Sequence, residues 1–286
     1  MPEPRNSPTV WNDALLANPH AVADKQSRVR RMFAAIAGSY DLNNHLHSLW
    51  MDQYWRRRAV QLAALKPTDS VLDAACGTGD LTLKFASELQ IQNAKCKVQN
   101  ETRVIGLDYT FEMLPIARRK SDLSNLKSQL PNPQSEISNL KSQIPDLKSP
   151  ISWLNADAMR LPLPDACTDV VSIAFGIRNV ADPQLALREF HRVLRPGGRV
   201  IILEFSLPKN PLLRGLYNFY FRRVLPVTAT IISGDRTGAY KYLPESVNTF
   251  IGRERMLEMM TTAGFVDGSQ FPLTFGVCVC YRGVKN

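Results

Sequence analysis

The sequence predicts an α/β protein with a mostly parallel sheet covered by helices on both faces. Short apolar strands alternate with helical segments over most of the chain, the pattern of sheets whose parallel strands are connected by helices. A glycine-containing loop at 76–80 joins one strand to a helix, and two strand-like runs after Gly264 predict a terminal hairpin at the sheet edge. A chain of 286 residues can bury one substantial core, so we expect one domain over residues 25–286.

Two helices are predicted before the sheet. Residues 1–24 are polar and rich in Pro and Asn, which favours a loosely held N-terminal arm. In the first helix, Lys25 to Ala37, apolar residues recur at three- and four-residue steps and form one stripe. The second helix is expected from Met51 to Leu65.

The alternation of short apolar runs with helical segments then predicts the positions of the remaining strands and helices. We predict strands at Ser70–Ala74, Arg103–Leu107, Ile151–Leu154, Asp169–Ala174 and Arg199–Glu204. The helices between and after them are predicted at Leu81–Leu89, Phe111–Arg119, Pro183–Leu194 and Arg253–Ala263. Cys278 and Cys280 alternate with valines, so both thiols are expected on one buried strand face.

Three segments interrupt this pattern. Ser-Asn-Leu-Lys-Ser-Gln occurs at Ser124 and again at Ser138 in a polar background, which predicts a mobile low-complexity surface insertion at 121–150. A smaller insertion is expected at 90–102. Residues 207–250 combine aromatic and basic side chains, which favours a segment that faces the substrate or a membrane; packing of the aromatics against the core is the alternative.

The formal net charge of +9 fits attraction to nucleic acid, to an anionic membrane or to an acidic substrate, and does not choose among them. No apolar run approaches the roughly 20 residues of a membrane span, and the N-terminus does not resemble a secretion signal. We therefore expect a cytoplasmic protein. The five cysteines show no metal-binding spacing, so no metal site is predicted.

The loop from Asp73 to Asp80 carries the first chemical signal. Gly77 and Gly79 would let the backbone approach a ligand at a helix N-terminus, where free N–H groups favour an anion. The third glycine of a dinucleotide site is missing, so a ligand with a carboxylate fits better than a pyrophosphate. An ordinary strand-to-helix turn is the alternative.

Two carboxylates follow the next strands. Asp108 ends the second strand, where it would accept hydrogen bonds from ribose hydroxyls or, alternatively, cap a helix. Asp157, followed by Ala158, comes after the third strand and would accept from an adenine amino group.

Three further segments carry a resemblance to a known family. They are Tyr40-Asp41-Leu42-Asn43-Asn44 continuing to Trp55-Arg56, Phe175-Gly176-Ile177-Arg178-Asn179-Val180, and Arg192-Val193-Leu194-Arg195-Pro196-Gly197-Gly198-Arg199 through Glu204-Phe205-Ser206. Over about residues 29–285, apart from the first two insertions, the chain resembles the ubiquinone/menaquinone biosynthesis C-methyltransferases. The resemblance implies a seven-stranded class I methyltransferase fold, Rossmann-like, with an N-terminal helical lid and an inserted segment before the last helix.

The resemblance also implies a cofactor and a reaction. S-adenosyl-L-methionine would be the methyl donor, with Thr78 and Asp108 at its methionine and ribose portions, and Asp157 and Ala158 beside its adenine; Asp73, Gly77 and Gly79 complete the assigned cofactor site. The acceptor would be ring carbon C-3 of demethylmenaquinol, or alternatively the equivalent carbon in ubiquinone or phylloquinone biosynthesis. Ala174 stands where family members often have serine, which removes one cofactor contact.

We expect Arg178 and Asn179 to act in catalysis by holding a ring hydroxyl and stabilising its developing oxyanion. A structural ion pair is the alternative for Arg178. No metal or covalent intermediate is required, because the sulfonium is already a methyl donor. Tyr40, Asp41, Asn43 and His45 are expected in the lid, without a catalytic role for His45.

The expected partners follow from this substrate. An isoprenoid quinol lies in a membrane, so we expect transient contact with the inner face of the cell membrane, involving Tyr217 and Phe221. No nucleic-acid partner is expected. An RNA methyltransferase and a non-catalytic scaffold of a quinone-biosynthesis complex are remote alternatives, and the sequence leaves the oligomeric state open, a homodimer included.

Overall fold

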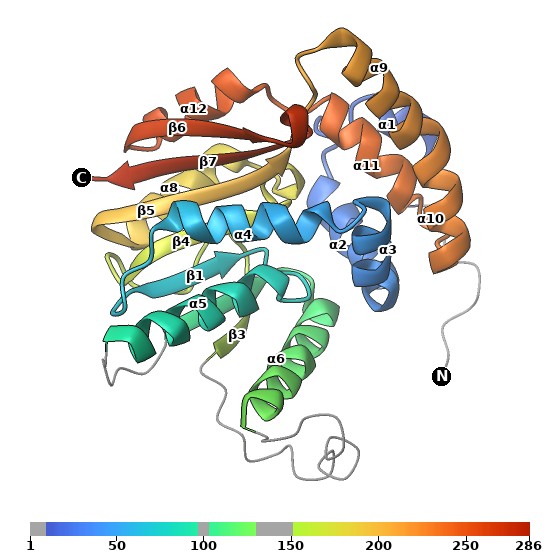
Figure 1. The fold of residues 1–286 in the computed structure, drawn as a ribbon. Helices are drawn as coiled ribbons and strands as arrows, with labels where there is room; N and C mark the ends of the chain where they lie inside the picture. Colours follow the sequence, from blue (N-terminus) through green and yellow to red (C-terminus); the bar gives the residue numbers. More distant parts are fainter. Residues whose placement is uncertain (1–9, 97–102, 130–150) are drawn as a thin grey trace.

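A seven-stranded mixed sheet forms the centre of the computed structural model, which describes residues 10–96, 103–129 and 151–286 (Figure 1). The strand order is β3-β2-β1-β4-β5-β7-β6. The first five strands in this order are parallel, whereas β7 is antiparallel to both β5 and β6. The strands are β1 (Ser70–Ala74), β2 (Arg103–Asp108), β3 (Ile151–Asn155), β4 (Thr168–Ala174), β5 (Leu194–Phe205), β6 (Phe265–Leu273) and β7 (Cys278–Lys285).

Helices cover both faces of this sheet, as predicted. In Figure 1, α4 (Met51–Ala63) and α5 (Asp80–Cys96) lie in front of it. Their apolar side chains share one core cluster with Val71, whereas Leu72 belongs to the cluster formed with α8 (Pro183–Val193) and α12 (Arg253–Thr262). Neighbouring residues of β1 serve opposite clusters because strand side chains alternate between faces. The α/β prediction is confirmed.

A group of helices lies beyond the carboxyl ends of the parallel strands. It is grouped at the right of Figure 1 and has its own apolar cluster, which includes Met32, Phe221 and Tyr242. The elements of this group are α1 (Asp13–Leu16), α2 (Lys25–Ile36), α3 (Tyr40–His47), α9 (Pro211–Phe219), a π-helix (Tyr220–Val224), α10 (Leu225–Ser233) and α11 (Ala239–Asn248).

Part of the predicted N-terminal arm is instead packed into this group. The Trp11 side chain is 1% exposed and lies against Tyr242, with ring centroids 4.5 Å apart. The backbone N–H groups of Val10 and Trp11 both donate to Thr237 O. The expectation of a loose arm was therefore wrong for residues 10–24, because the apolar residues within that polar stretch find partners about 230 residues away.

The two predicted insertions begin as helix. Helix α5 continues to Cys96, with Asn93 still buried, so residues 90–96 extend the helix. Helix α6 runs from Leu114 to Gln129 after a 3₁₀ turn at Phe111–Met113, and Ser121 within it is fully buried. The first copy of the repeat is thus helical, and the second copy lies outside the described residues.

Two smaller outcomes concern the last strands. Strand β5 begins at Leu194, five residues earlier than predicted, because Leu194 pairs with Thr168 before an irregularity in the ladder. Cys278 and Cys280 are buried on one face of β7 in the cluster with α4 and α5, as expected. Within the described parts of the chain, no helix combines the length and apolar character needed to cross a bilayer.

Candidate active site

The first cavity lies at the carboxyl ends of β1, β2 and β4. The strand order reverses between β1 and β4, and such a switch point is where open α/β sheets leave room for a ligand. Helix α2 covers the cavity from outside the sheet through Gln26, Arg30 and Phe33. About 740 Å³ of space lies between the walls, part of it open to solvent. None of these α2 residues was predicted from the sequence, because no local motif marks them.

Unusual backbone conformations shape the floor of this cavity. Ala75 and Phe175 follow β1 and β4 directly and have φ angles of +50° and +56°. Gly176 lets the two loops approach, since a Cβ atom there would lie 2.6 Å from the Ala75 Cβ. Left-handed non-glycine residues are costly and are found mainly at functional sites. Here they turn both loops away from the sheet and open the space between them.

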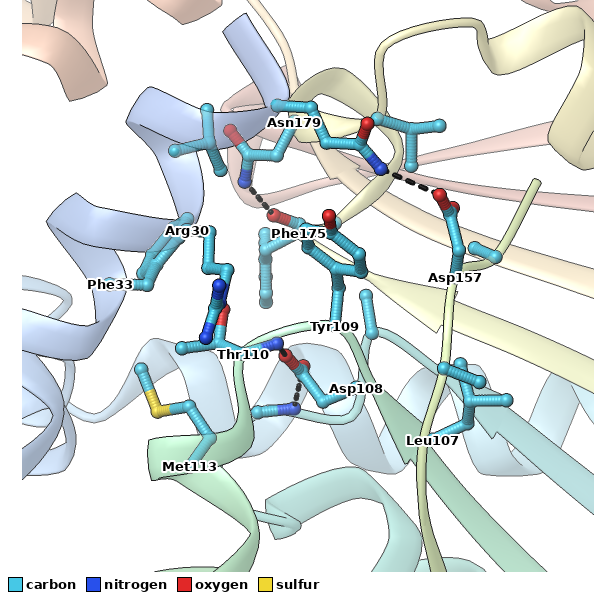
Figure 2. Close-up of a pocket in the computed structure, with 18 of the residues that line it drawn as sticks. Arg30, Phe33, Leu107, Asp108, Tyr109, Thr110, Met113, Asp157, Phe175 and Asn179 are labelled. Atoms are coloured by element: carbon cyan, nitrogen blue, oxygen red, sulfur yellow. Dashed lines mark hydrogen bonds between the residues drawn. The ribbon is translucent and has the colours of Figure 1, made fainter. Parts of the chain in front are cut away.

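Asp108 lies at the end of β2 and lines the first cavity, as predicted (Figure 2). Its Oδ2 accepts a hydrogen bond from Gly77 N at 2.8 Å, and its Oδ1 accepts one from Thr110 N at 2.7 Å. Burial raises the pKa of this carboxyl group above its usual value, although both backbone N–H groups act in the opposite direction. The side chain therefore links the glycine loop to β2 and holds Thr110. The N-cap of the next 3₁₀ turn is Thr110 and not Asp108, so the helix-capping alternative was wrong, and the contact with ribose stays a prediction.

Asp157 and Ala158 also line the first cavity, on the side of β3. Figure 2 shows the Asp157 carboxylate accepting a hydrogen bond from an amide group, which is Gln26 Nε2 at 2.6 Å. The other carboxylate oxygen accepts from Met159 N at 2.9 Å. Asp157 thus connects α2 to the sheet as well as facing the cavity.

Three residues assigned to the cofactor lie elsewhere. Asp73 is 1% exposed and points within the sheet, where its carboxylate accepts from Thr82 Oγ1 and Ser172 Oγ, both at 2.6 Å. Burial raises the Asp73 pKa to about 6. Gly79 is needed for packing, because a Cβ atom there would lie 2.7 Å from Trp153 Cη2. Neither Asp73 nor Gly79 lines the first cavity, so their assignment to the cofactor stays a prediction, whereas Gly77 does line the cavity, with φ +55°.

Thr78 is the third of these residues. Its side chain is buried and donates to Asp41 Oδ1 at 2.5 Å, which connects the glycine loop to α3. Lys120 pairs with Asp41 at 3.0 Å and also with Asp80. A contact of Thr78 with the cofactor stays a prediction, while the predicted position of Asp41 in a covering helix agrees with the structure.

A second cavity adjoins the first, and Phe33, Tyr40 and Phe175 line both. Its walls are largely aromatic, with Trp55 and Phe205 facing it from α4 and β5. Its charged lining residues are Asp52, Arg56 and Arg178. His45, at the edge of this group, hydrogen bonds through Nδ1 to Asp52 Oδ2 at 2.8 Å. The three segments that carry the family resemblance supply much of this lining, including Tyr40, Trp55, Arg56, Phe175, Arg178 and Phe205. The sequence did not show that these segments meet in one aromatic cavity, because they come from separate elements.

Arg178 lines the second cavity and is only 4% exposed. Its Nη1 donates to Glu204 Oε1 at 2.5 Å and to Phe175 O at 3.0 Å, and its Nε donates to Ser246 Oγ at 3.3 Å. The structural ion pair that was the alternative role is therefore present. Within the described chain, Nη2 has no hydrogen-bond partner, so this nitrogen remains for a ligand in the cavity.

Asn179 lines the first cavity beside Arg178. Its Nδ2 donates to Phe175 O at 3.1 Å, as Figure 2 shows, and its Oδ1 accepts from the Tyr242 hydroxyl at 2.9 Å. Adjacent residues of one loop thus face adjacent cavities. Protein contacts hold both side chains in these positions, and a catalytic role for them stays a prediction.

Comparison with known proteins agrees with this architecture. The model of the ubiE/COQ5 methyltransferase family matches residues 21–285. A demethylmenaquinone methyltransferase of Thermus thermophilus is 41% identical over 252 residues, covering 88% of this chain and 99% of the relative. A ubiquinone/menaquinone biosynthesis C-methyltransferase UbiE of a Geobacter species is 38% identical, covering 93% of this chain and all of the relative.

A solved structure shares the fold at low sequence identity. It is a SAM-dependent methyltransferase of Thermotoga maritima, described as a possible histamine N-methyltransferase, with a TM-score of 0.54 and 18% identity; the match covers 90% of this chain and all of that one. This likeness concerns the fold alone. Because the family model and the relatives both extend over nearly the whole sequence, the chain belongs to the ubiE/COQ5 methyltransferase family.

Proposed function

We propose that the protein transfers a methyl group from S-adenosylmethionine to ring carbon C-3 of demethylmenaquinol, giving menaquinol. The observation that carries this proposal is the junction of two unlike cavities at Tyr40 and Phe175. One has carboxylates at the ends of parallel strands, and the other is largely aromatic with two buried arginines, Arg56 and Arg178, and one buried carboxylate, Asp52. The names of the relatives in Thermus thermophilus and Geobacter support the same reaction class.

The first cavity fits the cofactor by the chemistry of its donors and acceptors. Asp108 would accept from the ribose hydroxyls, because each of its oxygens has a lone pair beyond those used by the two backbone N–H groups. Asp157 and Ala158 would lie beside the adenine. When bound there, the sulfonium supplies an electrophilic methyl group, so the protein need only orient and activate the acceptor.

The second cavity would hold the quinol ring away from water. Arg178 Nη2 would donate to the oxygen of the ring hydroxyl next to the acceptor carbon and stabilise the negative charge that this oxygen acquires as its proton leaves to water. The ring would then give the electron pair to the methyl group through C-3, with S-adenosylhomocysteine as the leaving group, and C-3 would lose its proton to water as the ring becomes aromatic again. Glu204 and Phe175 O hold the guanidinium in place, and Asn179 fixes the same loop through Tyr242. In this proposal the ion pair positions a catalytic group, so the two roles of Arg178 coexist.

We also propose that the protein works in the cytoplasm, in transient contact with the inner face of the cell membrane. Tyr217 and Phe221, the residues expected to touch lipid, are buried and stacked with ring centroids 4.1 Å apart, so packing against the core was the correct alternative for them. In this proposal, exposed apolar side chains of the neighbouring helices contact lipid instead, including Leu216 and Phe219 of α9 and Ile231 of α10.

A methyl-transfer assay tests the proposed reaction. Labelled S-adenosylmethionine is incubated with the protein and either demethylmenaquinol or the corresponding demethylated benzoquinol. Label in menaquinol, with slower transfer to the benzoquinol, is the expected result. Transfer to neither quinol by folded protein that binds the cofactor would overturn the proposal, and preferential transfer to the benzoquinol would favour the ubiquinone alternative.

A further inference from the structure

A third cavity continues from the second toward the surface of the helical group. Trp55, Phe205, Tyr240 and Leu243 are among the residues that line both. It has about 980 Å³ between its walls, part of it open to solvent, which exceeds the corresponding space of the first cavity. The three cavities thus form a series from the sheet to the surface, and the first two are already assigned to the cofactor and the ring.

The wall of the third cavity is mostly hydrocarbon. Leu49, Met51, Leu225, Leu243 and Val277 contribute to it from three helices, α4, α10 and α11, and two turns. A surface of this kind suits an aliphatic chain, because burying apolar area is favourable and requires no specific polar partner.

Several polar side chains of this wall are engaged with the protein. His47 hydrogen bonds to Asn43 O and Thr228 Oγ1, the Tyr220 hydroxyl donates to His47 O, and Thr274 Oγ1 accepts from Trp55 Nε1 at 2.7 Å. Asn43 Oδ1 and the Tyr240 hydroxyl have no hydrogen-bond partner among the described residues, but protein atoms enclose both and neither is accessible from the cavity. The accessible surface of the wall is therefore mostly hydrocarbon.

Two strained turns border this cavity. Leu49 and Trp50, between α3 and α4, have φ angles of +52° and +59°, and Thr274 and Phe275, between β6 and β7, have φ angles of +46° and +55°. Leu49 and Thr274 line the cavity directly. Such conformations cost energy in residues with side chains and persist where surrounding structure imposes them.

These turns also expose large apolar side chains. Leu49 is 78% exposed, Trp50 59% and Phe275 83%. Three such side chains on two turns beside one apolar cavity are what an interfacial anchor presents to lipid, with Trp50 suited to the headgroup region. An occupant of the third cavity that comes from the membrane would explain both the apolar wall of the cavity and the exposed apolar side chains of the two turns.

We propose that the third cavity holds the ring-proximal isoprene units of the substrate tail, and that the turns at 49–50 and 274–275 form its mouth against a lipid surface. This inference rests on the proposed quinol substrate and adds the path of the tail. With the ring in the second cavity, the tail leaves past Trp55 and Leu243, and its distal units remain in the bilayer. The cofactor, ring and tail are then bound by successive cavities.

The path is tested with two cavity-filling variants, Met51→Trp and Val277→Trp, on two substrates. For prenylated demethylmenaquinol we expect KM to rise about tenfold or more, because the first tail units lose their apolar site. For the same naphthoquinol ring without a tail, KM and kcat should stay within about twofold of wild type. Equal effects on both substrates in both variants, or no effect on either, would overturn the path. A wild type that methylates neither ring contradicts the proposed function instead.

The mouth is tested without any assay of activity. The wild type is floated with vesicles of equal parts phosphatidylethanolamine and phosphatidylglycerol, and compared with Leu49→Asn/Phe275→Asn. Asparagine adopts left-handed backbone readily, so both turns should keep their shape. The matched control is Ile91→Asn/Leu185→Asn, which removes two exposed apolar side chains of α5 and α8. We expect vesicle-bound protein to fall about fivefold or more in the first variant only. Absence of wild-type binding, or equal loss in the control, would refute the lipid-facing mouth.

Discussion

The first and third cavities are built in opposite ways. The first is formed mainly by loops that directly follow β1, β2, β3 and β4, together with one covering helix, and its carboxylates are fixed by backbone N–H groups. The third is formed by side chains from α3, α4 and the turn between them, from β5, the π-helix, α10 and α11, and from the terminal hairpin, and its wall is mostly hydrocarbon. Polar recognition is thus encoded locally at strand ends, whereas the apolar site depends on helices brought together from distant parts of the chain.

Arg178 lies between these regions, and its removal should have the largest effect. Arg178→Ala should lower kcat about a hundredfold or more, because the charge that faces the ring is lost. It should also lower the free energy of unfolding by about 3–5 kcal/mol, because Glu204 is left buried and unpaired. Steady-state kinetics and urea unfolding measure the two effects.

A double variant separates the two effects. Arg178→Met/Glu204→Leu removes both charges, so most of the lost stability should return. Turnover should stay low. A double variant with wild-type kcat would leave Arg178 only its structural role and would dissociate the second cavity from the chemistry.

Substitution of Asp73 tests whether this carboxylate, which lies within the sheet and not in the lining of the first cavity, has a structural role. Its pKa is about 6 in the folded protein against 3.8 when unperturbed, so the neutral form stabilises the fold at low pH. This contribution is complete below about pH 4 and is lost as the pH rises through 6. Asp73→Asn lacks this pH-dependent loss. The free energy of unfolding of the variant minus that of wild type should therefore increase by on the order of 3 kcal/mol from pH 4 to pH 8. Urea unfolding without cofactor measures it, and Asp267→Asn, at an exposed carboxylate, should show no such gain.

Substitution of Asp108 tests whether the carboxylates of the first cavity bind the cofactor without contributing to the binding of the quinol. Asp108→Asn should raise the Kd for S-adenosylmethionine about ten- to a hundredfold, because a charged acceptor is replaced by an amide that cannot accept through both of its terminal atoms. Affinity for the prenylated quinol should not change. Calorimetry measures both, with Glu112→Gln as a control carboxylate that is exposed and outside the cavity lining. Loss of quinol affinity in Asp108→Asn would contradict the separation of the two sites.

Ala174 offers the smallest effect. It lines the first cavity, so Ala174→Ser should add one neutral hydrogen bond to the cofactor. Such a bond contributes about 1 kcal/mol, so the Kd should fall about fivefold. An unchanged Kd in calorimetry would show that the remaining contacts already fix the cofactor at this point.

The sequence by itself determined the alternation of strands and helices, the terminal hairpin, and the placement of Gly77, Asp108 and Asp157 at the first cavity. These features depend on neighbours in the chain: side-chain alternation specifies a strand, and a residue that ends a parallel strand must lie at the carboxyl edge of the sheet.

Only the tertiary structure decided the rest. It turned Asp73 into the sheet, paired Arg178 with Glu204 across 26 residues and buried Trp11 against Tyr242. It also joined the helices that enclose the third cavity. Contacts between segments far apart in sequence leave no local period or motif, because each side chain finds its partner only when the chain is folded.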